Sequence, residues 1–218
     1  KSGKRFANES QNYLTFMLEV LDKEKKGESC APMYMIFDAN HRKNYPVGPL
    51  MPGKFFPDML VKIIHRDWFG SDFLTSANTI EELAIQTGID SEALQSTVER
   101  VNNFSATGKD LDFQRGDNER DRFSGDPSLL NPCLGPIDKA PFYAMRIDPG
   151  EFATCGGMAI NEYGQVLNND NQAIAGLYAT GNCTPALLTT YPGPGATIGP
   201  AMTFGFIAGK HISGSNTL

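Results

Sequence analysis

The 218-residue sequence lacks the features that mark nucleic-acid-binding, secreted and membrane-spanning proteins. Its formal net charge is −6, whereas a protein that binds nucleic acid normally presents basic side chains to the phosphates. It has no run of about 18 apolar residues, the length that a helix needs to cross a bilayer. The charged start KSGKRFANES is unlike a signal peptide. We therefore expect a cytoplasmic protein with no nucleic-acid partner and no integral membrane segment.

Cysteine and histidine are also scarce. The three histidines lie far apart, and the sequence has no C-x-x-C pair among its four cysteines, Cys30, Cys133, Cys155 and Cys183. Structural zinc sites use closely spaced cysteine and histidine ligands. The pattern therefore favours free thiols in a reducing compartment over disulfides or zinc, and it predicts no metal site.

A further absence is local, because residues 147–209 contain no Lys, Arg or His. An anionic substrate would find no cation in this stretch, and burying an unpaired charge is costly. The stretch instead offers the phenol of Tyr191 and the backbone amides of a turn rich in Pro and Gly. A phenol and an N–H group can together stabilise a developing enolate oxygen. These residues therefore favour a neutral ketone over an acid.

The periodicity of apolar residues changes near residue 148 and predicts an α+β fold. The first part predicts a buried strand over 32–38 and helices over 10–26, 80–88 and 91–108, the last two capped by Thr79 and Asp90. Gly88 is the expected stop of the helix that begins after Thr79. The second part alternates like strands and ends in a helix that is apolar on all sides. We expect this helix to be buried, with Gly199 as its N-cap and Pro200 as its first residue.

Two polar segments leave alternatives open. Residues 109–127 form a long loop, which favours either a functional or a flexible segment, and their alternating charges favour a solvated surface loop. Gly193, Gly195 and Gly199 are one residue off the dinucleotide-binding spacing, so the turn is not a Rossmann phosphate loop. On spacing alone, a tyrosine that only packs its ring is the commoner case for Tyr191.

Segments across nearly the whole chain resemble the flavin-dependent 3-ketosteroid dehydrogenases of the 3-oxosteroid 1-dehydrogenase type. These enzymes belong to the fumarate reductase and succinate dehydrogenase class of flavoproteins. The resemblance lies in RFANESQNY (5–13), the block 112–144, TCGGMAINEYGQVL (154–167), GLYATGN (176–182) and TYPGPGATIGPAMTFGFIAG (190–209).

The resemblance implies FAD as the cofactor and a Rossmann-like FAD-binding domain that is discontinuous in sequence. Residues 1–148 would be most of a mixed α/β substrate-binding cap, which is the catalytic domain. Residues 149–218 would be the C-terminal portion of the FAD-binding domain. The N-terminal FAD-binding segment, which carries the G-x-G-x-x-G loop, would be a missing partner. We therefore expect the isolated fragment to be inactive and to bind FAD weakly.

The resemblance also implies roles for individual residues. Tyr191 and the amide of Gly195 would hold the C3 carbonyl of a steroid-like ketone, and Tyr13 would remove the C2 proton. A free tyrosine has a pKa near 10, so Tyr13 would need a partner to act as a base; its spacing equally fits a helix-face core residue. The flavin would be flanked by Gly181, Asn182, Ala196, Thr197 and Ile198.

The expected reaction is therefore FAD-dependent dehydrogenation of ring A of a 3-ketosteroid at C1–C2. A hydride would pass to flavin N5, and an external electron acceptor would reoxidise the flavin. One alternative is a flavoprotein of the fumarate reductase class that acts on another enone or acid, held by a cap arginine such as Arg120 or Arg122. A second alternative is an inert, separately folded cap.

Overall fold

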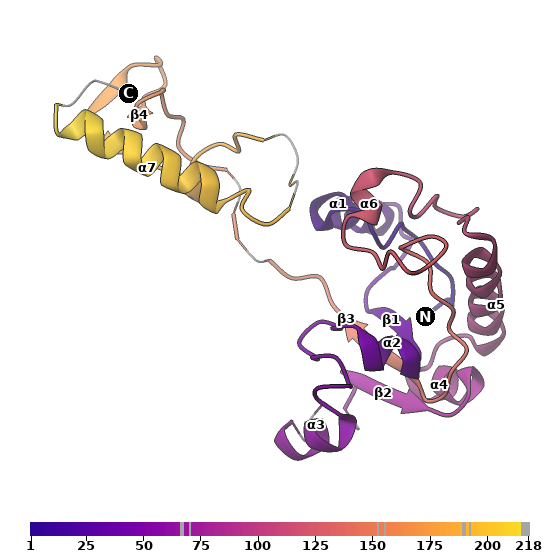
Figure 1. Cartoon of the computed structure of the whole chain (residues 1–218). Coiled ribbons are helices and arrows are strands. Elements are labelled where there is room, and N and C mark those ends of the chain that lie inside the picture. Colours follow the sequence, from indigo (N-terminus) through magenta and orange to yellow (C-terminus); the bar gives the residue numbers. More distant parts are fainter. Residues whose placement is uncertain are drawn as a thin grey trace. The chain divides into compact units, whose positions relative to one another are not determined.

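The structure is a computed structural model that describes residues 1–65, 68–69, 71–151, 153–154, 156–188, 191 and 193–214. The chain divides into two compact units (Figure 1). The first unit comprises Lys1–Gln11 and Phe16–Pro149, and the second comprises Asn12–Thr15 and Gly150–Leu218. The first turn of helix α1 thus belongs to the second unit.

The first unit is built on a three-stranded antiparallel sheet. Its strands are β1 (Met33–Phe37), β2 (Leu74–Ala77) and β3 (Phe142–Ile147), in the spatial order β1-β3-β2. The register pairs Met35 with Met145 and Ser76 with Tyr143. One face of the sheet buries an apolar cluster formed by Phe37, Val47, Leu50, Val61, Leu74, Tyr143 and Met145. The predicted strand over 32–38 is therefore confirmed as β1.

Six helices of the first part follow local sequence signals. They are α1 (Tyr13–Lys25), α2 (Ala39–Asn44), α3 (Asp58–Ile64), α4 (Ile80–Thr87), α5 (Ser91–Thr107) and α6 (Glu119–Arg122). Thr79 caps α4 by accepting a hydrogen bond from the Glu82 N–H at 3.1 Å, and Asp90 caps α5 in the same way. Both predicted caps are confirmed. Gly108 ends α5 with a φ of 72°, a left-handed conformation that favours glycine.

The segment 109–127 is more ordered than its charge pattern predicts. It contains the short helix α6 and two buried carboxylates, those of Asp110 and Asp121. The expectation of a solvated surface loop is therefore wrong for these two side chains. Their partners lie near the N-terminus, too far along the sequence for a local charge pattern to show them.

The second unit contains a two-stranded antiparallel sheet, a 3-10 turn and one long helix. These elements are β4 (Gln165–Leu167), β5 (Ala173–Tyr178), η1 (Gly181–Cys183) and α7 (Ile198–Ile212). The predicted start of the last helix is wrong, because Thr197 is its N-cap and Pro200 is its third residue. The physical reason is that the Gly199 N–H donates to the Gly195 carbonyl at 2.8 Å, which closes the first turn earlier.

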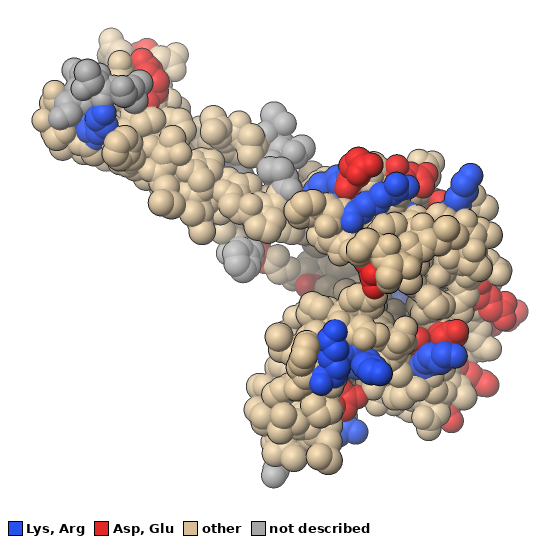
Figure 2. Space-filling model, in the orientation of Figure 1, with Lys and Arg blue, Asp and Glu red and all other residues tan. Residues whose placement is uncertain are grey.

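Helix α7 is not buried as its composition predicts. Ile198, Met202 and Phe206, four residues apart, have 64%, 71% and 66% of their surface exposed, and the buried residue of the helix is Ala208. In Figure 2 this region carries few charges before its C-terminal end. An apolar helix is buried only where apolar neighbours cover each face. The described residues cover one face. Among the described helices, none is long and apolar enough to cross a membrane.

Candidate active site

All of the residues predicted from the resemblance belong to the second unit. Tyr13 belongs to it through Asn12–Thr15, and the others lie in η1, in the turn around Tyr191 and at the start of α7. The Thr180 hydroxyl ties η1 to α7 by donating to the Ala201 carbonyl at 2.9 Å. The cofactor-binding candidates of η1 therefore lie beside the start of the helix that carries the others.

Gly181 has two reasons to be glycine at this junction. Its φ is 74°, which disfavours a side chain, and an added Cβ would lie 3.2 Å from the Cβ of Ala201. The next residue, Asn182, accepts a hydrogen bond from the Thr154 hydroxyl at its backbone carbonyl, at 3.4 Å. The observed features of both candidates thus concern their backbone.

The two predicted catalytic tyrosines are in contact. The ring centroids of Tyr13 and Tyr191 lie 4.5 Å apart, with an angle of 40° between the ring planes. Tyr13 has 57% of its surface exposed and stands at the first position of α1. Two phenols that are distant in sequence therefore meet within the second unit, and one of them is open to solvent.

The environment of the pair keeps Tyr13 protonated. Desolvation, followed by the hydrogen bond and charge interaction with Tyr191, raises the pKa of Tyr13 to about 12. A nearby cation would have the opposite effect, because it favours the phenolate. The sequence places no Lys, Arg or His between residues 147 and 209. The Tyr13 phenol is thus neutral at pH 7. It can accept a proton only if its own hydroxyl proton is transferred to another group.

The turn that precedes α7 presents backbone donors. Gly195 has a φ of 92°, and no atom lies within 4 Å of an added Cβ, so glycine serves the backbone conformation rather than a close contact. The N–H groups of Gly195, Thr197 and Ile198 donate to no described residue. Thr197 gives no side-chain cap, and Ala196 donates to the Gly193 carbonyl at 3.2 Å. Pro192 of this turn lies outside the described residues.

These donors fit one edge of a flavin. The isoalloxazine ring carries hydrogen-bond acceptors on its pyrimidine side, and the start of a helix provides unpaired N–H groups with partial positive charge. Thr197 and Ile198 supply two such groups, and most of the Ile198 side chain is exposed. The chemistry of the donor set is therefore compatible with FAD.

One structural residue was missed by the sequence reasoning. Gly157 packs so tightly against η1 that an added Cβ would lie 2.0 Å from the Cys183 carbonyl oxygen. The next residue, Met158, donates its N–H to the same carbonyl at 2.9 Å. The doubled glycine in TCGGM is the signal that could have found it.

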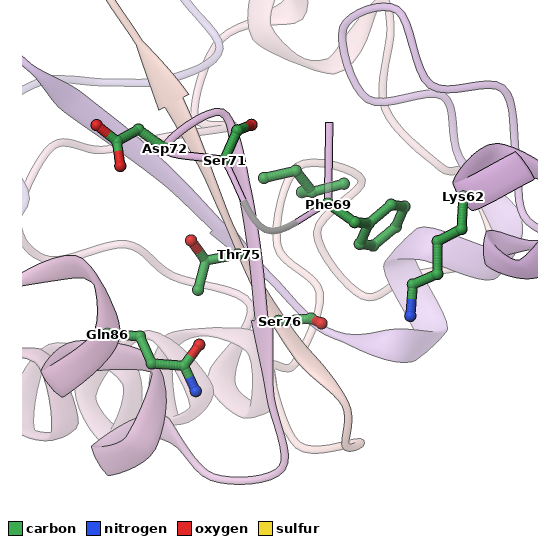
Figure 3. Close-up of a pocket in the computed structure, with 8 residues that line it drawn as sticks. Lys62, Phe69, Ser71, Asp72, Thr75, Ser76 and Gln86 are labelled. Carbon is green, nitrogen blue, oxygen red and sulfur yellow. The ribbon is translucent and has the colours of Figure 1, made fainter. Parts of the chain in front are cut away.

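A separate pocket of about 760 Å³ lies in the first unit (Figure 3). Lys62 and Asp72 stand on opposite sides of it, and Thr75 of β2 and Gln86 of α4 also line it. Lys62 lies over the Phe69 ring, 4.9 Å from its centroid, and Asp72 pairs with Arg146 at 3.4 Å. None of the predicted site residues lines this pocket, so we do not consider it the candidate active site.

Comparison with known proteins identifies the family of this chain. A family model described as FAD binding domain matches residues 1–198. The chain belongs to this FAD-binding family. The cofactor prediction, FAD, and the resemblance to the 3-ketosteroid dehydrogenases are thereby confirmed, and the described helices and strands agree with the predicted α+β class.

Three similar proteins share this flavoprotein's sequence or fold. The 3-oxosteroid 1-dehydrogenase of Mycolicibacterium smegmatis is 41% identical over 219 residues, covering 97% of this chain and 37% of the relative. The 4-oxocyclohexanecarboxylate 2-dehydrogenase of Sinomonas cyclohexanicum is 40% identical, covering 98% and 36%. The structure of the 3-ketosteroid delta1-dehydrogenase from Sterolibacterium denitrificans with 1,4-androstadiene-3,17-dione has a TM-score of 0.87 and 41% identity, covering 99% and 38%. The chain thus spans less than two fifths of their length.

Proposed function

We propose that this chain is part of a flavoprotein that dehydrogenates a ring ketone next to its carbonyl. The proposed substrate class is the 3-ketosteroids, and the proposed bond is C1–C2. The observation that carries the proposal is the contact of Tyr13 with Tyr191 in a turn whose Gly195 and Thr197 N–H groups donate to no described residue. Residues 1–148 would serve as the substrate cap and residues 149–218 as part of the FAD-binding domain.

In this proposal the chain's own residues prepare the ketone. The Tyr191 hydroxyl and the Gly195 N–H donate to the C3 carbonyl oxygen and stabilise the charge that develops there. Tyr13 accepts the proton that leaves C2 while its own hydroxyl proton passes to a second acceptor. FAD, when bound, supplies the acceptor for the hydride that leaves C1. The flavin would be held by Gly181, Asn182, Ala196, Thr197 and Ile198, and the N–H groups at the start of α7 would supply hydrogen-bond donors to it.

The charge of the stretch supports a neutral substrate. A carboxylate at this site would be desolvated without a cation from residues 147–209. A ketone oxygen carries only partial charge until the transition state, where donors that are already in place contribute most. The site therefore suits a group that becomes negative during the reaction better than one that is negative from the start.

The test uses the flavoprotein that contains this chain. A 3-ketosteroid should bleach the flavin absorbance, and an external electron acceptor should restore it. A panel of 3-ketosteroids that leaves the oxidised flavin spectrum unchanged would refute the substrate assignment. If adding FAD to the 218-residue chain alone produces neither a yellow complex nor a higher melting temperature, the inert-cap alternative gains support.

A second candidate substrate is a small ring ketone that carries a carboxylate. It is favoured by the relative named 4-oxocyclohexanecarboxylate 2-dehydrogenase, whose identity is almost as high as that of the steroid enzymes. The carboxylate would need a cation from the cap. Arg122 already donates to the Gly116 carbonyl, so Arg120 is the better candidate of the two. Flavin reduction by 4-oxocyclohexanecarboxylate that is lost in Arg120→Gln would favour this substrate.

A further inference from the structure

The segment immediately before Tyr13 is held by a loop from the middle of the chain. Residues 109–122, called loop 109–122 here, contact residues 5–10 at three places, namely at Arg5, at Asn8, and at Glu9 and Ser10. The first contact joins Arg5 to Asp110. The guanidinium donates to both carboxylate oxygens, at 2.9 and 2.7 Å, and the Asp110 side chain has no exposed surface. A buried bidentate pair of this kind fixes both distance and direction.

The second contact joins Asn8 to Asp121. The Asn8 Nδ2 donates to Asp121 Oδ2 at 2.9 Å, and the Gly116 N–H donates to the same oxygen at 3.0 Å. The side-chain oxygen of Asn8, Oδ1, accepts a hydrogen bond from the Ser10 N–H at 2.8 Å. Asn8 therefore links the loop to the backbone three residues before Tyr13.

The third contact joins Arg115 to Ser10. Arg115 Nε donates to the Ser10 hydroxyl at 2.8 Å, and another nitrogen of the same guanidinium lies 3.5 Å from a Glu9 carboxylate oxygen. From Ser10 the chain passes through Gln11 to Asn12. The Asn12 side chain accepts from the Thr15 N–H at 2.9 Å and so caps the first turn of α1, which begins at Tyr13.

Loop 109–122 is itself rigid enough to act as a fixed support. The Asp110 carboxylate accepts the backbone N–H groups of Asp112, Phe113 and Arg115. The buried Asn131 side chain donates to the carbonyls of Gly108 and Arg115, at 3.0 and 3.1 Å. Gly116 has a φ of 85°, and an added Cβ would lie 2.2 Å from Asn131 Oδ1. These bonds explain the buried acids that the charge pattern did not reveal.

We infer that loop 109–122 is a clamp that fixes the backbone of residues 5–10, from which the chain continues directly to Tyr13, and that Asn8, Asp121 and Arg115 are positioning residues for proton removal. The inference rests on the proposed function only through the role of Tyr13. Its physical basis is that the clamp ends three residues before the phenol, where a small shift of the backbone displaces the hydroxyl. A displacement of about 1 Å at a reacting group can lower a rate about 100-fold.

The sharpest test exchanges the two hydrogen-bonding partners. In Asn8→Asp, two carboxylates face each other in a buried place, where like charges repel and the contact opens. In the double variant Asn8→Asp/Asp121→Asn, an amide again faces a carboxylate, but the Gly116 N–H loses the oxygen that it shares with Asn8, so we expect partial recovery. We expect kcat to fall about 10- to 100-fold in the single variant and to be at least about threefold higher in the double variant than in the single variant. KM and FAD content should stay near native in both.

Two further variants complete the design. Lys109→Gln is the matched control, because Lys109 is an exposed residue of the same loop whose side chain bonds no described residue of the segment 5–10, and it should keep native kcat. Arg115→Gln removes the third contact from a partly exposed position and should fold even if Asn8→Asp does not. A native kcat in folded Asn8→Asp or Arg115→Gln would overturn the inference. A loss of kcat with a proportional loss of bound FAD would also overturn it.

Hydrogen exchange separates this inference from the proposed function. Backbone amides of residues 11–17 should exchange faster in Asn8→Asp and more slowly again in the double variant, whether or not a ketosteroid reduces the flavin. Unchanged exchange in the single variant would refute the clamp. An inactive native protein with the expected exchange pattern would refute the substrate assignment and leave the clamp supported.

Discussion

Removal of the Tyr191 hydroxyl tests the centre of the proposed mechanism. Tyr191→Phe keeps the ring that lies 4.5 Å from the Tyr13 ring, so the stacking surface is preserved. It removes a proposed donor to the ketone oxygen, and loss of one such donor in an enzyme typically lowers kcat by about 10²- to 10³-fold. It also removes the hydrogen bond that contributes to the raised pKa of Tyr13. We expect that pKa to fall from about 12 but to stay above about 10, because desolvation is the larger cause.

Two measurements check this prediction. Stopped-flow flavin reduction at saturating 3-ketosteroid gives the rate of the chemical step, and NMR of tyrosine labelled at Cζ follows the ionisation of Tyr13. The matched control is Tyr163→Phe, which changes a phenol that stacks on His211 elsewhere in the second unit. Flavin reduction at the native rate in Tyr191→Phe, with the pKa of Tyr13 unchanged, would refute the reasoning.

Three further predictions concern two glycines, Gly195 and Gly157, and the hydroxyl group of Tyr45. Gly195→Ala should cost about 1 kcal/mol of stability, because its φ of 92° disfavours a side chain; an unchanged thermal melting curve would contradict this. Gly157→Ala should unfold the region around η1, because the added Cβ would lie 2.0 Å from the Cys183 carbonyl oxygen; native amide exchange at residues 181–184 would count against it. The hydrogen bond to Asp126 raises the pKa of Tyr45 to about 12, so its stabilising effect should be present below pH 10 and lost between about pH 10 and 12. Denaturant unfolding across that range should show a smaller loss in Tyr45→Phe, and equal loss in both proteins would refute the assignment.

The helix boundaries that could be predicted from the sequence are set by residues only a few positions apart in the chain. Thr79 and Asp90 cap helices through bonds to residues three positions away, and Gly88 ends α4 in the left-handed conformation. The start of α7 was predicted two residues late because Pro200 fits the first helical position but also fits the third. A proline removes one donor, and every residue of the first turn lacks an acceptor within the helix.

The tertiary contacts could not be predicted in this way. Asp110 and Asp121 find Arg5 and Asn8 more than a hundred residues away, so their charges resembled those of a solvated loop. The contact of Tyr13 with Tyr191 is also distant in sequence, and spacing alone assigned no chemistry to either. The resemblance to a known family named both residues before the structure placed them together.

The raised pKa of Tyr13 restricts how the proposed reaction can proceed. A phenol with a pKa of about 12 is almost fully protonated at pH 7, so this chain does not prepare a tyrosinate in advance. In the proposed mechanism the Tyr191 hydroxyl and the Gly195 N–H instead act on the substrate. They polarise its carbonyl group, and this makes the adjacent C–H bond more acidic. The proton that reaches Tyr13 must then leave through a second acceptor as the bond breaks. The rate of proton removal should therefore fall strongly when the Tyr191 hydroxyl is removed and change little with pH between about 6 and 9. A rate that rises steeply with pH in both the native protein and Tyr191→Phe would contradict this mechanism.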